Sequence, residues 1–260
     1  MKIKFGPAGI GGIKDVSKIL EMYNKLGLKR AEIPFTYQVW VKNKKDAIYI
    51  KREAKKNNVK LSIHAPYWIN LNSREEEKVE KSKQRILRCC EVGSWMGIKR
   101  VVFHCGYYGK MSPEETFQNI KQAILDIQEV IKENKWNVKL CPEIIGKKNV
   151  FGSIKEISSL VKETKCSFCI DFAHVLARYN NYEMAQLKKY FPQKKWHCHF
   201  SGIEYGEKGE KHHKKTPEKE IKKLLSILPK NKDISIINES PNPIEDSVLS
   251  LRLLENIQKD

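Results

Sequence analysis

The sequence predicts an α/β fold, namely a single (β/α)8 TIM barrel with a metal site at the C-terminal ends of its strands. Short apolar runs alternate with helical patterns along the chain, and six of these runs end in a histidine or a carboxylate. The length of 260 residues matches one such barrel, which usually needs about 250. No segment of different composition interrupts the repeated strand–helix units, and this favours a closed barrel over an open sheet. We therefore expect one catalytic domain over residues 1–260.

The first two strand–helix units are marked by their boundaries. A strand over residues 2–5 ends in a Gly-Pro-Ala-Gly turn, and apolar residues at helical spacing over residues 16–26 stop at Gly27. A second strand is expected over residues 31–35, followed by a loop over 36–40 and a helix over 45–57. Further helices are expected over residues 74–96, 113–134, 153–163, 183–190, 217–228 and 245–257, each preceded by a short apolar strand.

The residues at the strand ends are the candidate metal ligands. The end residues are His64, His104, Glu143, Asp171, His199 and Glu239, separated by 40, 39, 28, 28 and 40 residues. Each step is about the length of one strand, one helix and two loops. Because the carboxyl ends of parallel strands gather at one end of a barrel, these side chains should meet there.

One layer deeper, the residues two positions before each end residue should share its inward face. They are Ser62, Val102, Cys141, Cys169, His197 and Ile237, most of them small or apolar, as a barrel interior requires. His197 is the exception, and we expect it to be a hydrogen-bond partner of a metal ligand rather than a ligand. Glu32 on the second strand either pairs with a lysine or contacts metal-bound water. Cys105 should turn outward from His104.

Composition narrows the class of protein. Lysine and arginine total 49 against 31 acidic residues, a net charge of +18 that suits a phosphate-bearing partner. The alternative is a lysine-rich, heat-adapted proteome in which the excess only aids solubility. No apolar run approaches the roughly 18 residues of a membrane span. The seven cysteines show no secreted disulfide pattern. We expect a cytoplasmic monomer with reduced cysteines and no membrane partner.

A mixed set of histidine, aspartate and glutamate without clustered thiolates suits Zn²⁺, with Mn²⁺ possible at some sites. A further group of ligand types, Glu210, His212 and His213, follows the seventh strand in an expected long loop. His174 lies three residues past Asp171. These residues can build a separate metal site beside the strand-end cluster.

The motifs carry a family resemblance over almost the whole chain. His64-Ala-Pro-Tyr67-Trp-Ile-Asn-Leu71 resembles the His-Gly-Ser-Tyr-Leu-Ile-Asn-Leu of the endonuclease IV family of zinc-dependent apurinic/apyrimidinic endonucleases. The segment from His104 to Gly106 is similar to its His-Pro-Gly, the segment from Asp171 to His174 to its Asp-Thr-x-His, and Glu239-Ser-Pro to its Glu-Thr-Pro.

Two motifs depart from the family pattern, and the chain is shorter than bacterial members. Glu210 replaces an aspartate in Asp-x-His-His, and Phe200-Ser-Gly replaces Leu-Asn-Asp. The shorter length suggests an archaeal or viral type.

The resemblance implies three Zn²⁺ ions per chain. One ion would be held by His64, His104 and Glu143, a second by Glu143, Asp171, His199 and Glu239, and a third by His174, Glu210 and His212. Glu143, as the bridging ligand, and Glu239, as a group that orients water, would be catalytic. The implied reaction is hydrolysis of the phosphodiester 5′ to an abasic site, leaving a 3′-hydroxyl and a 5′-deoxyribose phosphate. Removal of 3′ blocking groups is implied as a second activity.

Double-stranded DNA containing abasic sites is the implied partner, and two loops are expected to contact it. Tyr67, Trp68 and Asn70 follow the third strand, and Tyr37, Gln38 and Trp40 follow the second. Tyr67 and Trp68 stand where the family inserts a tyrosine and an apolar residue, and Trp40 is the candidate for the place of its inserting arginine. The alternative is that the tryptophans only pack against helices.

Two other classes stay open. A sugar isomerase or epimerase on the same barrel would use one metal bound by Glu143, Asp171, His199 and Glu239, but it leaves His174, Glu210, His212 and the charge unexplained. A non-catalytic nucleic-acid-binding barrel would not need intact ligand types at every strand end. Counting the metal ions in purified protein separates these classes.

Overall fold

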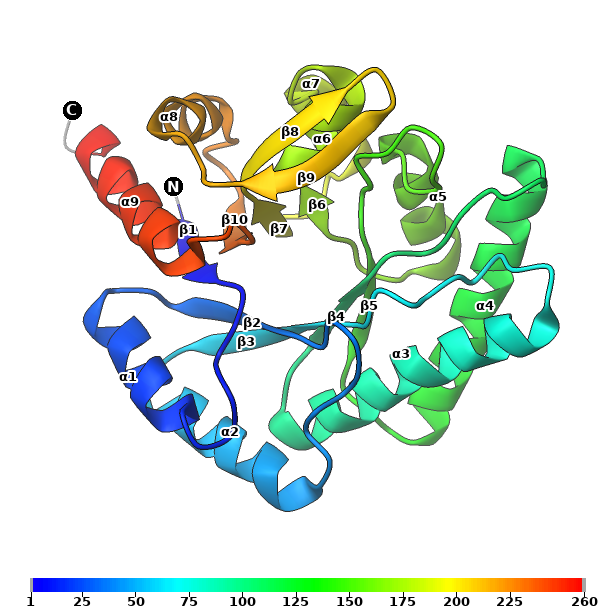
Figure 1. Cartoon of the computed structure of the whole chain (residues 1–260), viewed down its shortest axis with the longest axis horizontal. Helices are drawn as coiled ribbons and strands as arrows, with labels where there is room; N and C mark the ends of the chain where they lie inside the picture. Colours follow the sequence, from blue (N-terminus) through cyan, green and yellow to red (C-terminus); the bar gives the residue numbers. More distant parts are fainter. Residues whose placement is uncertain (1, 259–260) are drawn as a thin grey trace.

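A computed structural model describes residues 2–258 and contains eight parallel strands that surround one axis (Figure 1). They are β1 (Lys2–Pro7), β2 (Arg30–Pro34), β3 (Lys60–His64), β4 (Arg100–Phe103), β5 (Lys139–Pro142), β6 (Ile170–Asp171), β7 (Lys195–Phe200) and β10 (Asp233–Asn238). Residues 1 and 259–260 of the expected domain lie outside the described residues. The predicted α/β barrel fold is confirmed.

The strands form two four-stranded sheets, in the orders β1-β10-β7-β6 and β2-β3-β4-β5. Isolated parallel bridges cross both seams, from Ala8 to Glu32 and from Glu143 to Cys169. The amide of Gly9 donates to the Glu32 carbonyl over 2.8 Å at the first seam. At the second seam the amide of Ile144 donates to the Cys169 carbonyl over 3.1 Å. The two seams therefore stand next to residues with buried carboxylates, Glu32 and Glu143.

Helices cover the outside of the strands (Figure 1). They are α1 (Val16–Lys25), α2 (Lys44–Lys56), α3 (Glu76–Met96), α4 (Pro113–Glu133), α5 (Ile154–Thr164), α6 (Phe172–Tyr179), α7 (Met184–Tyr190), α8 (Glu218–Ile227) and α9 (Pro243–Ile257). Eight lie within two residues of the expected ranges. Helix α6 was not expected, and it begins immediately after β6 because the Asp171 carboxylate accepts a hydrogen bond from the His174 amide, 2.8 Å away.

A β-hairpin replaces the long loop that was expected after the seventh strand. Its strands are β8 (Gly202–Gly206) and β9 (Gly209–Lys214), which lie beside α6 in Figure 1. Tyr205 pairs with Glu210 and Glu204 pairs with His212, so Lys211 is an extra residue in β9 and forms a bulge. This bulge decides which side chains of β9 face the barrel.

The barrel interior has an apolar half and a polar half. Val102, Cys141 and Cys169 form a small buried cluster of their own, as the strand alternation predicted. Glu32, Ser62 and His197 are also buried and are joined by hydrogen bonds. All seven cysteines are free and buried. Cys105, expected to turn outward from His104, belongs to the main apolar core and not to the cluster inside the barrel. Within residues 2–258, no helix is both long enough and apolar enough to cross a membrane.

Gly6 is required by the β1–β2 seam. A Cβ at this position would lie 1.6 Å from the Arg30 carbonyl oxygen, so the strands would have to separate. We expect Gly6→Ala to lower the free energy of unfolding by about 2–4 kcal/mol. Denaturant unfolding measures this, with Gly12→Ala as the control, because its added Cβ would meet nothing closer than Asp15 Oδ2 at 3.7 Å. Equal stability of the two variants would contradict the tight seam.

Candidate metal centre

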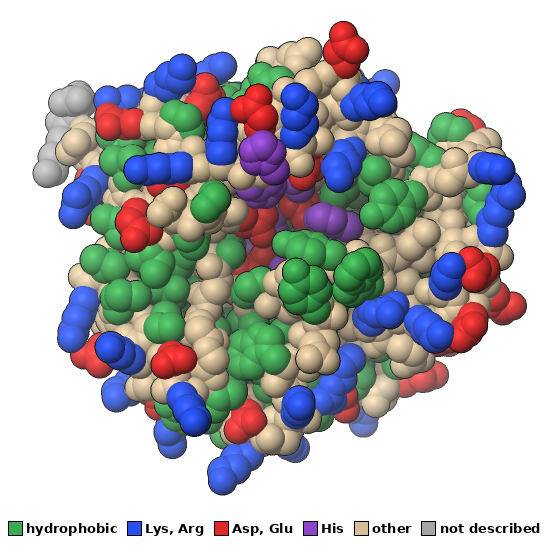
Figure 2. Space-filling model, viewed as in Figure 1, with side chains coloured by type: hydrophobic (Ala, Val, Ile, Leu, Met, Phe, Trp, Pro, Cys, Tyr) green, Lys and Arg blue, Asp and Glu red, His purple; other side chains and the backbone are tan. Residues whose placement is uncertain are grey.

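The six strand-end residues converge at the C-terminal end of the barrel. Figure 2 shows acidic and histidine side chains gathered in a hollow on this face, with hydrophobic side chains along its rim. Four groups of side chains have ligand atoms within 4.8 Å of one another, and one of them, Cys169, His197 and His199, lies deeper in the barrel than the other three. These three are His64, His104 and Glu143; then Glu143, Asp171, His199 and Glu239; and then Asp171, His174 and His213.

Glu143 is shared by the first two groups and is fully buried directly after β5. Its Oε2 lies 3.1 Å from Nε2 of His64 and 3.0 Å from Nε2 of His104. Its Oε1 lies 2.9 Å from Nδ1 of His199. One carboxylate therefore contacts a side chain at the end of β3, a side chain that follows β4 and a side chain within β7, which is the geometry of a bridging ligand.

The second group is completed by Asp171 at the end of β6 and by Glu239 after β10. Glu239 Oε2 lies 3.4 Å from Nδ1 of His199. Asp171 uses Oδ1 to cap α6, whereas its Oδ2 is buried and has no hydrogen-bond partner among the described residues. A buried carboxylate oxygen without a donor costs free energy, about 1–3 kcal/mol or more for a charged group, unless a cation occupies its lone pair.

The third group is built on α6 and the hairpin. The Nδ1 of His174 lies 2.9 Å from the Ile144 carbonyl oxygen, which identifies Nδ1 as the donor and leaves Nε2 to bind a metal ion once the ring is neutral. That Nε2 lies 3.3 Å from Nε2 of His213 and 3.4 Å from Oε2 of Glu210. Two imidazoles and one carboxylate thus meet beside Asp171.

His213, rather than His212, reaches this third group. Glu210 pairs with Tyr205 and His213 pairs with Ile203, so the bulge at Lys211 puts Glu210 and His213 on the inner face. Without the bulge, strand alternation would have put His212 there. In the structure His212 is exposed on the other face. The expected ligand His212 is therefore not brought to the site.

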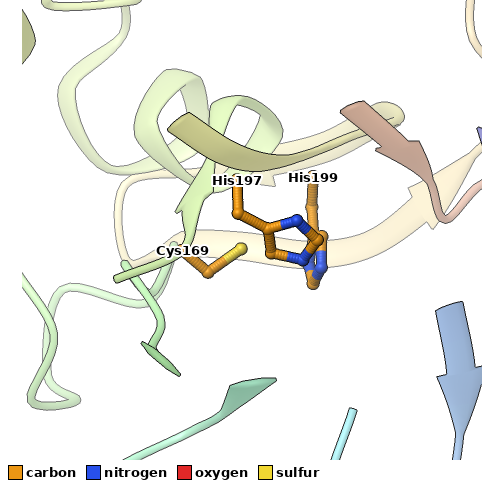
Figure 3. Close-up of side chains that lie close together, drawn as sticks. All are labelled: Cys169, His197 and His199. Atoms are coloured by element: carbon orange, nitrogen blue, oxygen red, sulfur yellow. The ribbon is translucent and has the colours of Figure 1, made fainter. Parts of the chain in front are cut away.

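Glu32 and His197 form a buried layer beneath His199. Glu32 Oε2 accepts a hydrogen bond from Ser62 Oγ at 2.6 Å and lies 3.1 Å from Nε2 of His197. Its Oε1 lies 2.8 Å from Nε2 of His199. Figure 3 shows His197 and His199 projecting from β7 with their rings close together and the Cys169 sulfur directed toward them. Glu32 thus contacts two histidines, where a lysine partner was expected, and faces the edge of His199 opposite the metal groups.

The charges of the site are strongly coupled. Burial alone would lower the pKa of His64, but the hydrogen bond and charge of Glu143 outweigh it and raise the pKa to about 9. Burial also opposes protonation of His174, whereas Asp171 and Glu210 raise its pKa to about 9. Burial raises the pKa of Asp171 despite its histidine neighbour. In the metal-free protein the histidines therefore supply the positive charge that the carboxylates need.

These features fit divalent metal ions. The donor set is nitrogen and carboxylate oxygen, which Zn²⁺ and Mn²⁺ both accept. Asp171 Oδ2 lacks a hydrogen-bond partner in the described structure, and His174 directs Nε2 toward Glu210 and His213. The residues that could hold ions are those of the three groups, together with Glu210.

The rim carries four exposed aromatic side chains. Tyr37, Tyr67, Trp68 and Tyr107 are 72%, 55%, 63% and 54% exposed. The Tyr67 ring is stacked on His104 with centroids 6.0 Å apart. Tyr107, which follows His104 by three residues, was not singled out from the sequence.

Of the other residues expected to contact DNA, one is exposed and two make contacts within the protein. Gln38 is exposed. Trp40 is half-buried and packs edge-on against Phe35, so it does not extend from the rim. Asn70 Oδ1 accepts from the amides of Asn72 and Tyr107, so it ties the loop after β3 to the loop after β4.

The chain belongs to the xylose isomerase-like TIM barrel family, which it matches over residues 20–257. An uncharacterized protein of Methanocaldococcus jannaschii is 35% identical over 266 residues, which cover 95% of both chains. The probable endonuclease 4 of Aquifex aeolicus is 32% identical over 142 residues, 52% of this chain and 49% of that protein. The resemblance to endonuclease IV predicted from the motifs is confirmed, over about half the length of that relative.

Solved structures share the whole fold. Endonuclease IV from Thermus thermophilus has a TM-score of 0.72 at 21% identity, covering 99% of this chain and 100% of that one. SacUVDE has a TM-score of 0.77 at 17% identity, with full coverage of both chains. A D-tagatose 3-epimerase-like protein has a TM-score of 0.74 at 19% identity, covering 98% and 97%. At these identities the likeness shows the fold alone.

We expect Zn²⁺ binding to the metal-free protein to release protons at pH 7. His64 and His174 have pKa values of about 9 and are protonated there, whereas a ligating imidazole must be neutral. Apparent affinity should therefore rise from pH 7 to pH 9, and proton release should fall as these groups lose their protons unaided. Calorimetry in two buffers of different ionisation enthalpy measures the proton count. The absence of proton release at pH 7 would contradict the raised pKa values of His64 and His174.

Proposed function

We propose that the protein is a metal-dependent phosphodiesterase that cleaves DNA 5′ to abasic sites, leaving a 3′-hydroxyl and a 5′-deoxyribose phosphate. The observation that carries the proposal is the adjacency of three ligand groups, two of which share Glu143 and two of which share Asp171. The match to endonuclease 4 relatives supports the same class. Removal of 3′ blocking groups is part of the proposal.

Different residues of the chain would hold the three metal ions and take part in the reaction. His64, His104 and Glu143 would hold one ion, Glu143, Asp171, His199 and Glu239 a second, and His174, Glu210 and His213 a third. Zn²⁺ ions, with Mn²⁺ acceptable at some positions, would supply positive charge for the phosphate and acidify water near neutral pH. Glu143 and Glu239 are the proposed catalytic carboxylates. Glu239, whose side chain is 19% exposed, would accept a proton from water.

Other residues would orient the candidate metal ligands. The Ile144 carbonyl fixes the tautomer of His174, and Glu32 holds the far edge of His199. Tyr67 and Trp68 would fill the gap beside an extruded nucleotide, with Tyr37, Gln38 and Tyr107 on the same rim. We propose that one domain over residues 1–260, acting as a monomer, is sufficient for the reaction.

A sugar epimerase is the second candidate, because the group around Glu143 and Glu239 alone could hold one ion and epimerase-like barrels share the fold. A single metal leaves His174, Glu210 and His213 without a role. Purified protein should therefore contain about three divalent ions and cleave abasic duplex. About one ion, with epimerisation of a ketose and no cleavage, would establish the epimerase instead.

His213→Ala and His212→Ala form a matched pair of tests. We expect His213→Ala to lose about one metal ion per chain and to lower turnover on abasic duplex by about a hundredfold or more, because one positive charge centre at the phosphate is lost. His212→Ala should retain its metal and most of its activity, since His212 is exposed. Elemental analysis and single-turnover cleavage measure both. The opposite pattern would mean that β9 pairs without the bulge when metal is bound.

The paired substitution of Tyr67→Ala and Trp68→Ala tests the aromatic rim. Stacking on an unpaired gap is worth about 1–3 kcal/mol for each aromatic ring, so affinity for abasic duplex should fall by tens-fold or more. Affinity for undamaged duplex should change little, because lysine–phosphate contacts supply it. Because Tyr67 stacks on His104, a candidate metal ligand, the metal content of the variant is measured as a control. Equal losses on both duplexes would move lesion recognition elsewhere.

A further inference from the structure

The end of the barrel where the strands begin is cationic, and we call it the floor. The end where the strands finish carries the acidic metal centre, and we call it the mouth. The first residue is lysine or arginine in six of the eight barrel strands: Lys2, Arg30, Lys60, Arg100, Lys139 and Lys195. Asp233 begins β10. Since parallel strands all start at the same end, these cations are collected at the floor of the barrel.

Two adjoining cavities open at this floor, with volumes of about 690 and 610 Å³. They share Lys99, Arg100 and Lys195. Between them they are lined by eleven basic side chains and one acidic one, Asp233. The basic residues are Lys4, Arg30, Lys51, Lys55, Lys60, Lys99, Arg100, Lys139, Lys165, Lys194 and Lys195. The ratio for the whole chain is 49 to 31, so general lysine richness does not account for this surface.

The cations at the floor lack acidic partners within ion-pair distance in the described structure. Among the described residues, none of the eleven forms an ion pair, whereas lysines on the outer helices pair with glutamates, as Lys25 does with Glu21. Arg30 is half-buried and donates to Ser235 Oγ at 2.9 Å and to the Lys29 carbonyl oxygen. Burial lowers the pKa of Arg30 and the nearby Arg100 adds to this effect, although the charge of Asp233 opposes it. Helix C-termini favour nearby cations, but Arg30, Arg100 and Lys195 stand on strands rather than in a last helical turn.

The second cavity also has polar and apolar walls. Buried Ser62, His197 and Ser235 line it from the barrel interior. Val59, Leu61, Met96, Ile98 and Trp196 line it from the strands and helices. A volume of this size is typical of a small-molecule site, and the combination of clustered cations with an apolar wall suits a phosphate chain joined to a less polar group.

We propose that the floor cavities form a binding site for a small polyphosphorylated ligand of nucleotide size, separate from the metal centre. The phosphates would be held by Lys99, Arg100 and Lys195, which border both cavities, with Arg30 as the half-buried cation beneath them. The proposal does not depend on what the metal centre does.

Calorimetric titration of the metal-loaded protein with tripolyphosphate and with ATP tests the proposal. We expect one molecule of either probe to bind, with tighter binding of ATP marking a nucleoside polyphosphate and equal binding marking an inorganic one. Affinity should fall as salt rises. The triple variant Lys99→Gln, Arg100→Gln, Lys195→Gln should bind at least about tenfold more weakly, since three charge contacts are lost.

The matched control removes the same charge elsewhere. Lys18, Lys155 and Lys219 are exposed, unpaired in the described structure, and lie in the first turns of α1, α5 and α8, toward the mouth. Their triple glutamine variant should bind both probes within about twofold of wild type. Thermal unfolding and metal content, measured before and after titration, verify that each variant is folded and that the probes have not removed metal.

Four results would overturn the proposal. One is the absence of saturable binding at low salt. Another is equal weakening in the floor variant and its control. The third is binding of short oligonucleotides through Lys99, Arg100 and Lys195 without binding of ATP or tripolyphosphate. If the probes bound only at the mouth metals, the floor variant would bind as tightly as wild type, and the proposal would fail.

Discussion

The buried carboxylate of Glu143 is the constraint around which the rest of the site is arranged. It follows β5 at a seam that the parallel bridge to Cys169 crosses, and neither oxygen reaches solvent. Because an isolated buried carboxylate is strongly unfavourable, its surroundings must supply compensating charge. Nitrogen atoms of His64, His104 and His199 do so within 3.1 Å. The seam, the strand ends and the ligand groups are therefore parts of one electrostatic arrangement.

Strand direction explains why the two ends of the barrel have opposite chemistry. Each barrel strand runs from the floor to the mouth, so a residue type favoured at strand starts or strand ends is collected at one end. Lysine and arginine begin six barrel strands, whereas histidines and carboxylates cluster where the strands finish. The C-terminal end of the barrel therefore gathers ligand-type side chains, and the opposite end gathers cations.

The fold and the convergence of the strand-end residues could be predicted from the sequence because both depend on periodicity and on the common direction of the strands. The inward layer of Val102, Cys141 and Cys169 followed from strand alternation for the same reason. His213 could not be chosen over His212, because its inward position depends on one bulge residue, Lys211, and thus on pairing within the hairpin. The partners of Glu32 come from β3 and β7, which are distant in sequence.

The Glu32 layer is better explained by the metal centre than by stability. Glu32 Oε1 and His199 Nε2 lie 2.8 Å apart but are not aligned for a hydrogen bond, and both are buried without another partner in the described structure. Buried polar atoms in this state cost free energy, so an apolar filling like that of Val102 and Cys141 would be more stable. A carboxylate against one edge of His199 instead directs the other edge, Nδ1, toward Glu143 and Glu239. His197 links the same carboxylate to the floor cavity, so a continuous path of buried polar side chains runs between the two charged ends of the barrel.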